Sequence, residues 1–146
     1  MENTWQQSPK QRLKTWREFR LQLDDIEYEE DCLQEIVDWW KMAPVGSREL
    51  DIYDVDSWPN PWQLIYNNSL DENSIALGMA YTLHLSDWEC DVCLVQNQKE
   101  SWLKIIVLVD DNYVLNYTYG IVEKKEVLDG CSIVEKYKTS QLKTNG

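Results

Sequence analysis

Residues 70–120 read LDENSIALGMAYTLHLSDWECDVCLVQNQKESWLKIIVLVDDNYVLNYTYG, and this stretch decides the fold. Its first part, 71–86, is apolar almost all round, which predicts a helix that is buried on several sides. Three apolar or alternating segments follow at 90–96, 102–109 and 113–119, and they predict strands. Because the links between them are short, we expect an antiparallel meander packed against the helix.

The segments that flank this stretch predict further helices and one more strand. Ser8 and Pro9 have the residue types of a helix N-cap and a first helical position, and Asn60 with Pro61 repeats the pattern. A final alternating strand is expected at 131–138. The sequence therefore predicts an α+β fold: N-terminal helices plus a central buried helix packed on a small antiparallel sheet of three to four strands.

The chain of 146 residues has the length of one domain with a real core. Its sequence contains no internal repeat, low-complexity segment or linker. We therefore expect a single domain over residues 1–146, with an N-terminal helical part at 8–43 and a core at 60–138.

Acidic residues outnumber basic ones by 26 to 14, which gives a formal net charge of −12. A nucleic-acid backbone or an anionic membrane requires a positive surface, so neither is expected as a partner. A basic protein partner stays open, as does nucleic-acid mimicry, in which carboxylates stand in for phosphates; plain solubility is the third interpretation. No run of about 18 apolar residues predicts a membrane span, and residues 1–14 lack the apolar stretch of a signal peptide.

Residue types that catalyse reactions or bind metals form no recognisable pattern. Cys90 and Cys93 have CxxC spacing, but residues three apart in a strand point to opposite faces, so no zinc site is expected. His84 is the only histidine, and no spacing supplies it with a nucleophile. We therefore expect no metal and no cofactor.

The only basic cluster consists of Lys10, Lys14 and Arg17, on one side of the first predicted helix. One interpretation is a docking surface for an acidic partner. The other is a solvated helix face that pairs with the acidic stretch at 24–38.

Eight Trp and eight Tyr against one Phe are unusual, because rings with a polar edge suit half-buried positions and interfaces. Trp39 lies beside the buried stripe of the second helix, and Trp58 and Trp62 flank a proline-containing loop. These three residues and the basic cluster form the candidate partner surface. Packing of Trp58 and Trp62 against the core is the alternative.

The order of one helix and three strands resembles the core of transglutaminase-like cysteine enzymes, in the papain-like superfamily. The segment YVLNYTYG at 113–120 matches the third strand, where the family typically has YVLD-x-TYG, and the helix and first two strands match in pattern. In that family a Cys opens the helix, a His starts the second strand and an Asp ends the third. Here these positions fall at Glu72 or an immediate neighbour, at Ser101 or Trp102, and at Asn116.

The resemblance implies a non-catalytic relative of these enzymes. A carboxylate, a non-basic residue and an amide cannot form a thiolate–imidazolium pair. The former site would persist as a vestigial pocket edged by Glu72, Trp102 and Asn116, with no catalytic residue.

The acidic, Trp- and Tyr-rich composition, with its WPNPW loop, also resembles small accessory proteins of large tailed bacteriophages. That resemblance implies a role in the virion or its assembly, and a location in the host cytoplasm or the assembled virion. We expect a non-catalytic protein-interaction module that binds a protein partner, and its oligomeric state stays open. The alternatives are an acidic nucleic-acid mimic that inhibits a host protein, and a hydrolase or transferase with an unrecognised site. Candidate residues for that site are Asp54, Asp56, Glu72, His84 and Asn116.

Overall fold

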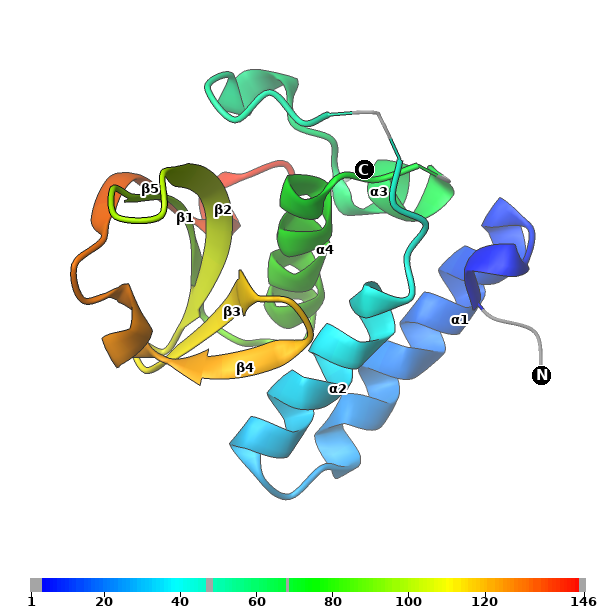
Figure 1. The fold of residues 1–146 in the computed structure, drawn as a ribbon. Coiled ribbons are helices and arrows are strands. Elements are labelled where there is room, and N and C mark those ends of the chain that lie inside the picture. Colours follow the sequence, from blue (N-terminus) through cyan, green and yellow to red (C-terminus); the bar gives the residue numbers. More distant parts are fainter. Residues whose placement is uncertain (1–3, 47–48, 68, 145–146) are drawn as a thin grey trace.

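The computed structural model describes residues 4–46, 49–67 and 69–144. Helices α1 and α2 lie side by side, and α4 stands between them and the sheet (Figure 1). The bounds of the α-helices are α1 (Pro9–Gln22), α2 (Glu29–Lys41), α3 (Pro61–Tyr66) and α4 (Glu72–Leu85). None of the helices in these ranges is both long and apolar enough to cross a membrane.

One antiparallel sheet contains all the strands of the described ranges, in the order β4-β3-β2-β1-β5. The strands are β1 (Cys90–Asn97), β2 (Trp102–Val109), β3 (Tyr113–Thr118), β4 (Ile121–Lys124) and β5 (Ser132–Lys138). The α+β class and the antiparallel meander of β1 to β3 are thereby confirmed. The sheet has five strands, whereas the sequence predicts three or four. The missed strand is β4, which is only four residues long and half charged, so it carries no apolar run.

Helix α4 is the centre of the core, and ten of its residues are buried. A Cβ atom added to Gly78 would lie 2.4 Å from ring carbons of Trp40, so glycine is required for this close approach. One turn later, the Thr82 hydroxyl accepts hydrogen bonds from two buried indoles, Trp40 Nε1 at 2.9 Å and Trp16 Nε1 at 3.1 Å. Helices α1 and α2 are therefore both attached to α4 at this hydroxyl.

Strand β2 lies in the middle of the sheet and is buried on both faces. Val107 belongs to the core on the α4 side, whereas Ile106 and Leu108 face the other side. That second face packs against Leu128, in the connection that runs from β4 at one edge of the sheet to β5 at the other. This arrangement explains why the segment KIIVLV reads as continuously apolar.

The helix starts follow the local signals in the sequence. The Ser8 hydroxyl accepts the backbone N–H of Gln11, at 3.3 Å. Asn60 and Gln63 form a reciprocal capping box at the start of α3. These two helix starts are confirmed as predicted.

Candidate functional site

The start of α4 meets the sheet where β2 and β3 separate. The register pairs Val107 with Leu115 and goes no further, because Asn116 turns the backbone into the left-handed region with φ of 70°. Beyond this point two side chains replace the missing strand: Asn73 Oδ1 accepts the N–H of Ile105, and Asn116 Nδ2 donates to its carbonyl, both at 2.9 Å. The first turn of α4 thus packs at the point where β2 and β3 separate, and Asn73 from this turn bonds the β2 backbone.

Glu72, the first residue of α4, lies in this junction and is paired with a lysine from β2. Lys104 Nζ is 3.0 Å from Glu72 Oε1 and also donates to the Tyr117 carbonyl at 2.7 Å. The same ammonium lies 4.9 Å from the ring centroid of Trp102. The Lys104 side chain is only 16% exposed, so this ion pair is partly shielded from solvent.

The structure brings together two of the three residues of the predicted vestigial pocket. Asn116 Nδ2 is 3.4 Å from the Glu72 carbonyl. Trp102 contacts the Lys104 ammonium that pairs with Glu72, and its indole N–H donates to Glu100 at 3.0 Å. Sequence reasoning missed Lys104, because a lysine at the start of an apolar strand gives no signal of a partner 32 residues earlier in the chain.

Beside this junction lies a cleft of about 260 Å³, formed by α2, α4 and the turn between β3 and β4. Glu72 and Asn116 line it, whereas Trp102 does not. The remaining lining residues come from three segments of the chain: Val37, Lys41, Val45, Ile75, Met79, Tyr119 and Gly120. We call this site the α2–α4 cleft.

The α2–α4 cleft has buried apolar walls and an exposed apolar rim. Ile75 and Met79 are 5% and 3% exposed, whereas Val45 and Tyr119 at the rim are 73% and 65% exposed. The β3–β4 turn, which lies next to α2 in Figure 1, is held there because the Tyr119 hydroxyl donates to the Lys41 carbonyl at 3.1 Å. This hydrogen bond places the turn against α2, where it forms one side of the cleft.

The basic part of the candidate partner surface is solvent-exposed. Lys10, Lys14 and Arg17 are all exposed on α1. Within the described ranges none of them lies within 4.0 Å of a carboxylate, so they do not pair with the acidic stretch at 24–38. These three side chains are therefore available to solvent.

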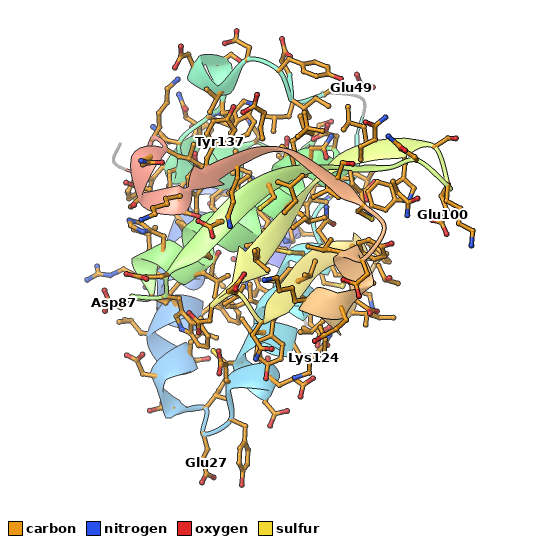
Figure 2. The ribbon with its side chains drawn as sticks, turned by 90° about the vertical axis from the view of Figure 1, so that its left-hand side faces the viewer. Glu27, Glu49, Asp87, Glu100, Lys124 and Tyr137 are labelled. Carbon is orange, nitrogen blue, oxygen red and sulfur yellow. The ribbon has the colours of Figure 1, made fainter. Side chains whose placement is uncertain are left out.

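The three tryptophans of the candidate partner surface differ in burial, and none of them is fully exposed. Trp58 is 2% exposed, donates its indole N–H to the Asp51 carbonyl at 2.7 Å, and packs edge-on against Tyr137, which Figure 2 labels on β5. Trp58 thus packs in the core, and its assignment to the surface is corrected. Trp39 and Trp62 are half-buried, and Trp39 stacks on Phe19 with ring centroids 5.4 Å apart.

Two neighbouring grooves, of about 660 and 360 Å³, share Trp88 and Asp110 in their walls. Carboxylates from several segments line them: Asp24, Glu27, Glu29, Asp87, Glu89, Asp91, Asp110 and Asp111. Figure 2 shows Asp87 just beyond the end of α4 and Glu27 at the tip of the connection between α1 and α2. A hydrogen bond with Asp110 raises the pKa of Glu29, as expected where two carboxyl groups meet.

Three of the four cysteines are buried thiols that are unsuited to act as nucleophiles. Burial raises the pKa of Cys90 and of Cys93 to about 12, and burial also raises the pKa of Cys32. These thiols therefore stay protonated at neutral pH. Among residues 4–46, 49–67 and 69–144, no group of three or more His, Cys, Asp or Glu side chains could hold a metal ion.

Comparison of the chain with models of known protein families finds no match, and a search of curated proteins finds no match either.

Proposed function

We propose that the chain is a non-catalytic protein-interaction module that binds its partner at the α2–α4 cleft. The observation that carries this proposal is the continuity of the buried apolar walls with the exposed Val45 and Tyr119 at the rim. Apolar surface that is concave and rimmed by exposed apolar side chains is typical of interaction sites, because burying it gains free energy.

The chemistry around the cleft supports a binding role over a catalytic one. The Glu72 carboxylate at the start of α4 is already neutralised by Lys104, at 3.0 Å. His84 lies near the other end of α4, about 18 Å along the helix axis at about 1.5 Å per residue. A general base at that distance cannot reach a group held in the cleft.

The resemblance of the composition to accessory proteins of tailed bacteriophages defines the class of partner to test first. We expect a virion or assembly protein, and the chain would act in the host cytoplasm or the assembled virion. The transglutaminase-like resemblance adds that the cleft is what remains of a former active site, edged by Glu72 and Asn116.

A matched pair of variants tests the proposal. Val45→Asp puts a charge at the cleft rim, and Leu21→Asp puts the same charge at a similarly exposed apolar residue of α1, since the two side chains are 73% and 64% exposed. A photoreactive amino acid at position 45 identifies the neighbouring protein in a lysate that contains the natural partners. Binding of that purified protein to each variant is then measured by calorimetry.

Val45→Asp should weaken binding at least tenfold, because a carboxylate must be desolvated at an apolar contact. Leu21→Asp should leave the affinity unchanged. Equal affinities for the two variants would refute the assignment of the interface to the cleft.

A second candidate function is supported by the grooves around Trp88. Carboxylates gather there from the α1–α2 connection, the end of α4 and the β2–β3 turn. Such a surface suits a basic protein that normally binds nucleic acid. In this case Glu89→Lys should abolish binding to that protein, whereas Glu18→Lys on α1 should not, and affinity should fall steeply with salt. Affinity that is insensitive to salt would exclude this candidate.

A further inference from the structure

The α2–α4 cleft has room for one large side chain and little more. An apolar cavity of about 150 Å³ is enough to bind benzene, and this cleft measures about 260 Å³. The walls that would touch such a group are the buried side chains of Val37, Ile75 and Met79. An occupant therefore has an apolar body of about one aromatic or aliphatic side chain.

The ionised groups of the cleft leave one positive charge unpaired. Glu72 is bound to Lys104, at 3.0 Å. Lys41 lies at the cleft with its Nζ atom 5.9 Å from the Tyr119 ring centroid, and within the described part of the chain no carboxylate lies within 4.0 Å of it. Among the described residues that line the cleft, Lys41 is therefore the charged side chain without an ion-pair partner, although the whole chain carries −12.

The other polar group of the cleft is already engaged. Both N–H groups of the Asn116 amide have acceptors, the carbonyls of Ile105 and Glu72 at 2.9 and 3.4 Å. These N–H groups are therefore not available to a bound ligand.

A C-terminal residue suits both features of the cleft, because it supplies an apolar side chain and a carboxylate next to it. We propose that the α2–α4 cleft binds the C-terminal residue of a partner protein, an apolar residue whose α-carboxylate pairs with Lys41. This inference rests on the proposed function, since it names the part of the partner that enters the same cleft. The exposed side chains of Val45 and Tyr119 contact the residues that precede the terminus.

The test uses fluorescein-labelled pentapeptides that end in Phe or Leu, each with a free C-terminal carboxylate or a C-terminal amide. Their binding to the full chain is measured by fluorescence anisotropy up to millimolar peptide. Three variants are compared: Lys41→Gln, Lys41→Arg, and Lys99→Gln as a control at another exposed lysine, outside the cleft and the candidate partner surface. Substituting Lys41 leaves its backbone carbonyl in place, so the hydrogen bond from Tyr119 that holds the cleft is retained.

The free acids should bind about tenfold tighter than the amides, as a charge-assisted hydrogen bond provides. Lys41→Gln should abolish this preference, whereas Lys41→Arg and Lys99→Gln should retain it. Equal binding of acid and amide, a preference that survives in Lys41→Gln, or no binding of either free acid at millimolar concentration would overturn the inference. Binding of 3-phenylpropionate as tightly as the peptide would also overturn it, because the site would then serve a small molecule.

Failure of the inference can be distinguished from failure of the proposed function. If acid and amide bind equally well and Val45→Asp weakens both, the cleft is a protein-binding site without terminal recognition. If Val45→Asp changes neither the peptides nor the natural partner, the proposed function itself fails.

Discussion

Replacing Thr82 by Val tests whether one buried hydroxyl attaches both N-terminal helices to α4. The Thr82 hydroxyl accepts from the indole N–H groups of Trp16 and Trp40, and it donates to the Gly78 carbonyl at 2.8 Å. All three side chains are at most 1% exposed. Valine has nearly the same shape as threonine, so the substitution removes the hydroxyl and leaves the packing intact.

The expected loss follows from the two indole donors. A buried donor left without an acceptor costs about 1–3 kcal/mol. Thr82→Val orphans two of them, so the free energy of unfolding should fall by about 2–6 kcal/mol. Small domains are stable by only about 5–15 kcal/mol in total, which makes this a large share.

Thr82→Ser is the matched control, because it keeps the hydroxyl and removes one buried methyl group. Its expected cost is about 1 kcal/mol. Both variants are unfolded with urea and followed by tryptophan fluorescence, and the midpoints are compared at equal slopes. If Thr82→Val proves as stable as Thr82→Ser, the hydroxyl does not hold the two helices and the reasoning is refuted.

Three further predictions concern the sites. Asn116→Asp removes the donor to the Ile105 carbonyl, so the free energy of unfolding should fall by about 1–3 kcal/mol. Urea titration measures this loss, and unchanged stability would contradict the role of Asn116 where β2 and β3 separate. In the native protein only Cys131, the half-buried cysteine, should react readily with a thiol reagent at pH 8, and all four should react in urea; fast native labelling of another cysteine would refute the assigned burial. The hydrogen bond with Asp110 raises the pKa of Glu29 in the folded state, so its contribution to stability is lost as pH rises through that pKa. Glu29→Gln should therefore be more stable than the natural chain at neutral pH, and this difference in stability should disappear in acid. Urea midpoints of both proteins between about pH 4 and 7 measure the difference. A difference that does not change with pH would contradict the prediction.

Much of the fold follows from local signals in the sequence. Four features could be predicted because each depends on residues close together in the chain. They are the helix caps at Ser8 and Asn60, the apolar helix at 72–85 and the apolar strand at 102–109. The short strand β4, which is half charged, has no such local signal. It is stabilised by its pairing with β3, and this contact cannot be read from the residues of β4 alone.

The candidate site was predictable only in part. The resemblance placed Glu72 and Asn116 at one pocket, and the structure brings these two side chains to one cleft. The surplus of tryptophan and tyrosine placed Trp58 on the surface as one of two interpretations, but burial of that ring depends on contact with Tyr137, far away in the sequence. No local pattern reveals such a contact.

The sequence by itself determined the class of the fold, the central helix and the meander of residues 70–120, since these depend on periodicity and capping. Only the tertiary structure decided that Lys104 pairs with Glu72 and that α2, α4 and the β3–β4 turn form an apolar cleft. It also decided that Lys41 lies at this cleft with no carboxylate of the described residues within 4.0 Å. The physical reason is that charge pairing and cleft shape depend on distances between segments, and packing sets those distances after the local elements have formed.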